Sequence, residues 1–148
     1  MTKGYPSAVG EYLETLTFRS RYDYASGQAG IEVPITLSLD DARSVRLLAK
    51  VDTRASFCIF QREYAEQLGI EVEGGQHQVV RTATGRFEAY GHTVKLVCFD
   101  WEFETVVYFA AEANFSRNVL GRLGWLQHFL LGLVDHDATL FLSHHDDD

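Results

Sequence analysis

Basic side chains and long apolar runs are both scarce in this sequence. Its 148 residues carry 13 Lys and Arg against 21 Asp and Glu, which gives a formal net charge of −8. The Lys and Arg residues do not cluster into a basic stripe, which argues against a nucleic-acid partner. The longest apolar runs, residues 106–111 and 129–134, are too short to cross a bilayer. Residues 1–10 lack the basic-then-apolar pattern of a secretion signal, so we expect a soluble, cytoplasmic protein without a membrane partner.

Cysteine is equally sparse, and neither cysteine carries a predicted function. Cys58 and Cys98 stand alone in apolar segments, without metal-site spacing or a CxxC pair, so we expect two buried free thiols. His144 and His145 precede an acidic end that we interpret as a solvated tail rather than a preorganised metal site. The sequence therefore predicts no metal and no other cofactor.

Proline is rare as well, with only two in the chain. Short segments rich in Val, Ile, Leu, Phe and Tyr are separated by turn residues, a pattern that favours many strands and few helices. We expect an all-β fold with hairpins that turn at residues 40–41, near residues 84–85, at residues 100–101 and across residues 135–138.

Two segments favour short helices instead. Residues 61–68 place Arg62 and Glu66 at the ion-pairing spacing, and Gly69 follows in a position to end the helix. Residues 122–129 carry apolar side chains on one face, which predicts a second helix packed on a sheet.

The most unusual carboxylate is Asp52, which lies between apolar segments and begins the run Asp52-Thr53-Arg54-Ala55-Ser56. One interpretation is an aspartate that caps a turn through its own backbone, in an unrelated β-barrel domain that needs no dimer. The other depends on two further elements, the hairpin tip "TATGR" and the run "NVLGR" ahead of the second expected helix. In this order and rough spacing, the three elements resemble the retropepsin-like aspartic proteases. The resemblance covers roughly residues 31–142.

This resemblance implies an all-β fold, a retropepsin-like closed β-barrel or sandwich with one or two short helices, in a homodimer. We expect the retropepsin-like domain over residues 31–142, an N-terminal arm or extra strand over residues 1–30, and an acidic, disordered tail over residues 143–148. The implied activity is that of an aspartic endopeptidase acting on a peptide or protein substrate through two Asp52 carboxylates and an activated water. Like-charge repulsion makes such a pair share one proton, as is general for aspartic proteases.

The resemblance also implies roles for individual residues. Asp52 is the catalytic carboxylate, and Thr53 is the buried hydroxyl that ties the two active-site loops together across the dimer. Ala55 and Ser56 line the loop. The remaining site residues are the flap that closes over a bound peptide (Thr82, Ala83, Thr84 and Gly85) and the turn that supports the aspartate loop (Val119, Leu120 and Gly121).

One position departs from the family pattern, because Arg54 stands where the motif has glycine. Arginine keeps the backbone N–H but adds a long cation near the expected twofold axis. A guanidinium that reached a dyad carboxylate would lower the pKa of that carboxylate, and proton sharing would fail. A guanidinium paired outward, with Glu63 or with the partner chain, would leave the dyad usable. The alternative function is therefore a catalytically impaired peptide-binding or scaffold module with the same fold.

Overall fold

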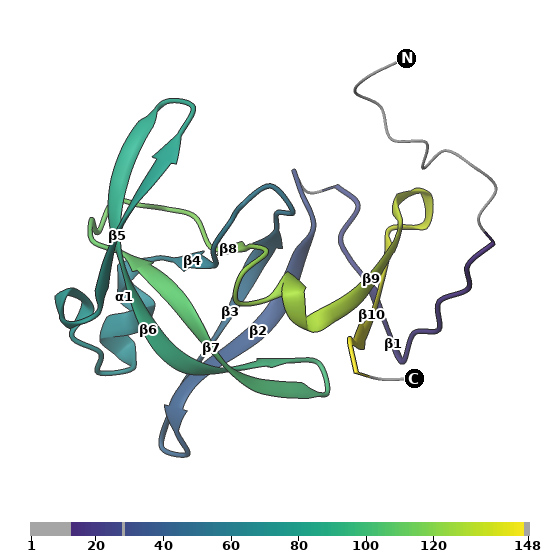
Figure 1. Cartoon of the computed structure of the whole chain (residues 1–148), viewed down its shortest axis with the longest axis horizontal. Coiled ribbons are helices and arrows are strands. Elements are labelled where there is room, and N and C mark those ends of the chain that lie inside the picture. Colours follow the sequence, from purple (N-terminus) through teal and green to yellow (C-terminus); the bar gives the residue numbers. More distant parts are fainter. Residues whose placement is uncertain (1–12, 28, 147–148) are drawn as a thin grey trace, which may run out of the picture.

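Two β-sheets form the body of the structure, a computed structural model that describes residues 13–27 and 29–146 (Figure 1). The larger sheet has seven strands in the order β2-β3-β8-β4-β7-β6-β5, and the smaller has three in the order β1-β10-β9. Within the described ranges the strands are β1 (Ser20–Asp23), β2 (Glu32–Asp40), β3 (Arg43–Val51), β4 (Ile59–Phe60), β5 (Gln76–Thr82), β6 (Gly85–Cys98), β7 (Trp101–Ala110), β8 (Val119–Leu120), β9 (Phe129–Val134) and β10 (Thr139–His144). The helical elements are α1 (Arg62–Gln67) and three 3₁₀ turns, η1 (Val72–Gly74), η2 (Leu126–His128) and η3 (Asp135–Asp137).

The larger sheet closes on itself into a barrel. Strand β2 pairs with β3 on one side and, through Thr36 to Ser38, with β6 on the other. Alternation along β2 buries Val33, Ile35 and Leu37, whose exposed fractions are 0%, 2% and 0%. The closed, mainly β fold expected from the sequence is confirmed, and the four expected hairpin turns fall between the strands where they were predicted.

Helix α1 agrees with the sequence prediction, and its position is fixed by Arg62. The Arg62 guanidinium pairs with Glu73 and Glu66 and donates to the carbonyl oxygen of Ala111 at 3.0 Å. Hydrogen bonding to Arg62 lowers the pKa of the Glu73 carboxyl. One partly buried side chain thus joins the helix, the η1 turn and the end of β7.

The second predicted helix is wrong. Residues 122–129 contain only the 3₁₀ turn η2, and Phe129 already begins β9. Gly124 has φ +102°, a left-handed conformation that ends any helix started at Arg122, and its carbonyl oxygen accepts a hydrogen bond from the buried Thr105 hydroxyl at 2.9 Å. The apolar residues of this segment are still buried without a helix: Trp125, for example, is fully buried although its backbone is irregular.

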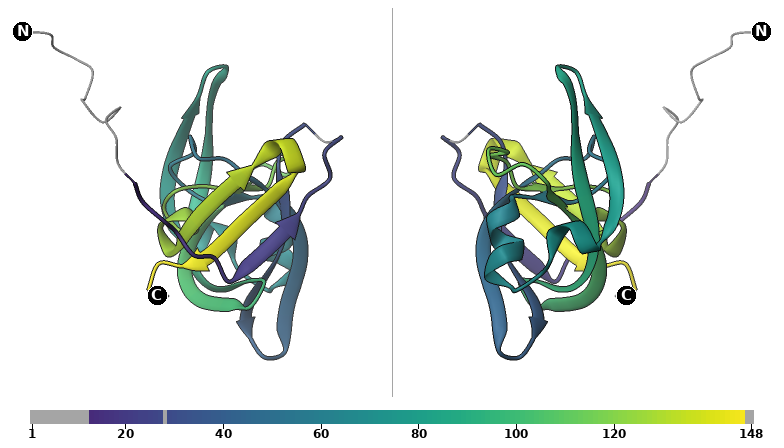
Figure 2. Two further views of the ribbon diagram at one scale, coloured as in Figure 1. Left: turned by 90° about the vertical axis from the view of Figure 1, so that its right-hand side faces the viewer. Right: turned by 90° about the vertical axis from the view of Figure 1, so that its left-hand side faces the viewer.

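The smaller sheet covers one side of the barrel (Figure 2) and shares its core. Leu140 and Leu142 of β10 belong to the same buried cluster as Val33 of β2. Strand β1 provides an extra strand within residues 1–30, while residues 1–12 of the expected arm lie outside the described residues. Strand β10 continues through the first two residues of the segment expected to be a tail, and Ser143 is buried there; residues 147–148 also lie outside the described residues.

Cys58 and Cys98 are buried and unpaired, as predicted. Burial raises the pKa of both thiols to about 12. None of the helices in the described ranges combines the length and apolar character needed to cross a membrane.

Candidate active site

Asp52 lies where two parallel strands end side by side. Strand β3 pairs in parallel with β8, with Lys50 opposite Val119 and Val51 opposite Leu120. The Asp52 backbone N–H extends this ladder by donating to the Leu120 carbonyl oxygen at 3.0 Å. The chain then turns sharply, because the Ala55 N–H donates to the Asp52 carbonyl oxygen at 3.2 Å. This pairing brings together two segments that are far apart in the sequence and sets the position of the half-buried Asp52 side chain.

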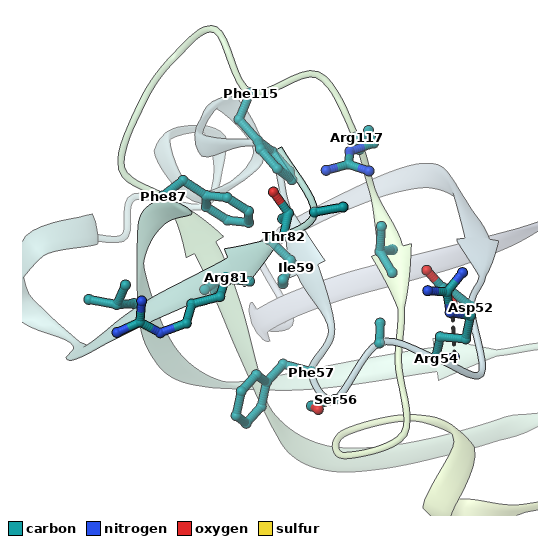
Figure 3. A pocket seen from close by; sticks show the side chains of 15 residues that line it. Asp52, Arg54, Ser56, Phe57, Ile59, Arg81, Thr82, Phe87, Phe115 and Arg117 are labelled. Carbon is teal, nitrogen blue, oxygen red and sulfur yellow. Dashed lines mark hydrogen bonds between the residues drawn. The ribbon is translucent and has the colours of Figure 1, made fainter. Parts of the chain in front are cut away.

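Arg54 orients the Asp52 carboxylate through its backbone. The Arg54 N–H donates a hydrogen bond to Oδ1 of Asp52 at 2.9 Å (Figure 3). The Arg54 side chain is exposed, and its guanidinium forms no ion pair with Asp52, Glu63 or another carboxylate of residues 13–27 and 29–146. Within one chain, then, the arginine retains the N–H that the motif glycine would offer and leaves the carboxylate unpaired.

Gly121 packs so closely against the backbone of this loop that no side chain would fit at its position. A Cβ atom at Gly121 would lie 2.3 Å from the Phe57 carbonyl oxygen and 2.8 Å from that of Ala55. The next two residues after Gly121 hold the loop by hydrogen bonds, from Arg122 N–H to the Ala55 carbonyl oxygen and from Leu123 N–H to that of Ser56, both at 2.9 Å.

A pocket of about 540 Å³ opens in front of Asp52 (Figure 3). Six of the residues to which the sequence analysis gives a site role line it, and so does Arg54. Asp52 is the only acidic residue in the lining that the structure describes. The lining residues are Asp52, Arg54, Ala55, Ser56, Phe57, Ile59, Val79, Val80, Arg81, Thr82, Ala83, Phe87, Phe115, Arg117 and Val119.

The expected site residues outside this lining have other positions. Thr84 and Gly85 complete the tip of the hairpin, and Leu120 and Gly121 lie behind the aspartate loop. Thr53 is exposed in the single chain, so the buried role expected for its hydroxyl requires a second chain.

The β5–β6 hairpin projects from the barrel (Figures 1 and 2), and its residues 79–83 and Phe87 line the pocket. Its last strand pair is Thr82 and Gly85, and the Thr82 hydroxyl donates to the Gly85 carbonyl oxygen at 3.1 Å. Gly85 has φ +152°, a value that favours glycine at this turn. Two register steps inward, Val80 and Phe87 lie opposite each other and present apolar side chains to the pocket.

Sequence reasoning missed the apolar wall of this pocket. The Phe87 ring packs on Phe115 with centroids 4.7 Å apart, and the Phe57 ring packs on Tyr108 at 4.9 Å. The only sequence signal was alternation, since Phe57 and Ile59 point to the same side two residues apart. Nothing local to the sequence connects Phe115 with Phe87.

The arrangement offers a half-buried, oriented carboxylate facing a partly apolar pocket, which suits proton transfer to and from a bound water or amide. His144, His145 and Asp146 form one group of possible metal ligands in the described ranges, with ligand atoms within 4.8 Å of one another. This group begins at the last residue of strand β10 and contributes nothing to the pocket lining.

Comparisons with known proteins agree with this geometry. The family model described as aspartyl protease matches residues 35–133. The fold is similar to a retropepsin-like aspartic protease from Rickettsia conorii, with a TM-score of 0.60 and 20% identity over 84% of this chain and 97% of that one. It is also similar to the EIAV protease complexed with the inhibitor HBY-793, with a TM-score of 0.50 and 14% identity over 64% of this chain and 84% of that one. No curated protein sequence matches the chain.

Proposed function

The chain belongs to the retropepsin-like branch of the aspartyl protease family, and from this premise we propose that it hydrolyses peptide bonds as a homodimer, through Asp52 of each subunit and an activated water. The observation that carries the proposal is the oriented Asp52 carboxylate at the pocket, with the loop that holds it supported by Gly121.

The need for a second chain follows from the chemistry. Peptide hydrolysis by carboxylates requires one ionised group to activate water and one protonated group to polarise the scissile carbonyl. In the described lining of the pocket in front of Asp52, one chain supplies a single acidic residue, Asp52 itself. A twofold axis through this face places a second Asp52 beside the first, and the two carboxyl groups then share one proton because both do not readily ionise at close range.

The reaction then proceeds in two balanced steps. The ionised Asp52 accepts a proton from the water, whose oxygen bonds to the carbonyl carbon, while the partner subunit's Asp52 donates its proton to the carbonyl oxygen. The resulting tetrahedral intermediate collapses as the C–N bond breaks. The amide nitrogen takes the proton held by the first Asp52, and the partner subunit's Asp52 recovers its own, so the dyad returns to its starting state.

Arg54 is compatible with this mechanism. Its N–H bond to Asp52 at 2.9 Å supplies the orientation expected of the motif glycine. Its guanidinium is not paired with Asp52 in the described chain, so the charge that would block proton sharing is not bound to the carboxylate. These two observations favour an active enzyme over an impaired peptide-binding module. The β5–β6 hairpin, with its tip at Thr82 to Gly85, is the flap that closes over the bound peptide in this proposal.

The test is cleavage of a broad peptide library at mildly acidic pH, followed by mass spectrometry. The wild type should cleave, and Asp52→Asn should lose the activity because the dyad no longer contains an ionisable pair. Asp41→Asn is a matched control, since Asp41 is exposed in the β2–β3 turn outside the pocket lining, and should keep the activity. Chelators should have no effect, whereas peptides carrying a hydroxyl that mimics the tetrahedral intermediate should inhibit. Cleavage that persists in Asp52→Asn would refute the mechanism.

A further inference from the structure

The pocket in front of Asp52 is lined by cations, although the chain as a whole is acidic. Three arginines line it, Arg54, Arg81 and Arg117, against the one carboxylate of Asp52, while the whole chain has a net charge of −8. The three arginines are not equivalent. The Arg81 side chain extends away from Asp52, whereas the Arg117 guanidinium lies beside Phe115 (Figure 3).

Arg117 is held against an aromatic ring and has no acidic partner among the described residues. Its Cζ atom lies 5.6 Å from the centroid of the Phe115 ring, within the range of a cation–π contact. Phe115 is itself packed on Phe87 of strand β6. No carboxylate of residues 13–27 and 29–146 pairs with the Arg117 guanidinium. An arginine that served an internal ion pair would have a carboxylate beside it, so the free fork is available to a ligand.

The backbone next to Arg117 is fixed by its neighbour. The Asn118 side chain donates to Oε1 of Gln61 at 2.9 Å and accepts from the Gln61 N–H at 3.0 Å. The Asn118 carbonyl oxygen also accepts from the Lys50 N–H at 2.9 Å, one step before the β3–β8 ladder. Anchoring the loop in this way lowers the ordering cost when the guanidinium binds a partner.

Resting on the proposed function, we propose that Arg117 selects an acidic side chain, Asp or Glu, in the bound peptide. The planar guanidinium matches a carboxylate with two parallel hydrogen bonds, which a neutral amide side chain does not reproduce. The apolar wall formed by Ile59, Val80 and Phe87 accommodates an apolar residue beside it. Arg117 is thus a specificity-determining residue, and the preferred substrate is an acidic peptide with apolar residues next to the acid.

The test uses binding, so that it does not depend on catalysis. The probe is an array of capped octapeptides of apolar residues and Gln, in which one Glu replaces Gln at each position in turn. The Asp52→Asn protein should bind the best Glu peptide about tenfold more tightly than its Gln parent, since hydrogen bonds to charged groups are the stronger class. Adding Arg117→Gln should remove this difference, and it should shrink as salt is raised.

Arg46→Gln is the matched control, because Arg46 is exposed on β3 and does not line the pocket. It removes the same charge and should keep the preference. Equal binding of Glu and Gln peptides, no measurable binding of either, or a preference that survives Arg117→Gln would each overturn the inference.

Cleavage of the same array by the wild type separates the two proposals. If the wild type cleaves no peptide while Asp52→Asn binds Glu peptides through Arg117, the proposed function fails and the acidic preference stands. If the wild type cleaves Glu and Gln peptides equally and Arg117→Gln changes nothing, the preference fails and the proposed function stands.

Discussion

Replacing Gly121 by alanine should disrupt the aspartate loop and destabilise the whole domain. The added Cβ would lie 2.3 Å from the Phe57 carbonyl oxygen and 2.6 Å from its carbon, and these are backbone atoms that cannot swing aside as a side chain does. Relief requires the loop to separate from the turn, which weakens the hydrogen bonds of Arg122 and Leu123 to residues 55–56. Two such bonds and the strain of overpacking amount to about 2–6 kcal/mol of unfolding free energy.

Urea denaturation followed by tryptophan fluorescence measures this loss, because Trp125 is fully buried in the native state. Protein concentrations must be matched, since the stability of a dimer depends on concentration. Gly27→Ala is the control: a Cβ at Gly27 meets nothing within 4 Å, and the substitution should leave the midpoint unchanged or raise it slightly.

The same variant links stability to the site. Where Gly121→Ala still folds at low temperature, peptide cleavage should be lost, because Asp52 is positioned by the loop that the alanine displaces. A Gly121→Ala protein that unfolds at the same urea concentration as Gly27→Ala and cleaves peptides normally would refute the argument that close backbone packing supports the aspartate loop.

Four other outcomes are expected. Arg54→Gly should raise the cleavage rate modestly, because two guanidinium groups near the proposed dimer axis, although not paired with Asp52, still favour ionisation of both dyad carboxylates; an unchanged rate would show that the guanidinium does not act on the dyad. The Ala83 and Thr84 amides at the hairpin tip should exchange hydrogen faster than those of the barrel strands, and equally slow exchange would argue against a flap. Cys58 and Cys98, with pKa values raised by burial to about 12, should resist iodoacetamide at pH 8 until the protein unfolds. Rapid labelling of the folded protein would contradict this burial. Because the thiols of the unfolded chain ionise at lower pH than the buried ones, the free energy of unfolding should also fall as the pH rises from about 9 towards 12. Sedimentation at micromolar concentration should show a dimer, whereas a stable monomer with full peptidase activity would exclude the proposed dyad.

Local patterns in the sequence determined most of the barrel. Alternating apolar residues separated by turn residues predicted the hairpins, because the period of two along a strand decides which side chains are buried whatever the strand's partner. Helix α1 could also be predicted from local features, namely the spacing of its Arg62–Glu66 ion pair and the glycine, Gly69, that follows its end. The resemblance of the Asp52 and Gly121 segments to a known family located the centre of the site.

The tertiary structure decided what depends on contacts between distant segments. Residues 122–129 have apolar residues at helical spacing, yet Gly124 adopts φ +102° and its carbonyl oxygen accepts a hydrogen bond from the Thr105 hydroxyl of β7. A contact with a distant strand therefore overrides the local helical preference. The lateral order of the strands, with β8 beside β3 and β2 closing on β6, likewise reflects the packing of the whole core.

The pocket wall shows the same division between local and distant information. Phe115 and Arg117 have no periodicity that marks them in the sequence, and they become part of the site only because Asn118 is anchored to Gln61 and Phe115 packs on Phe87. Asp52 was recognisable from its immediate neighbours, whereas the cation that we propose faces the substrate was not. The physical reason is that periodicity records burial along one strand, while the charge of a pocket is set by side chains that meet only when the barrel closes.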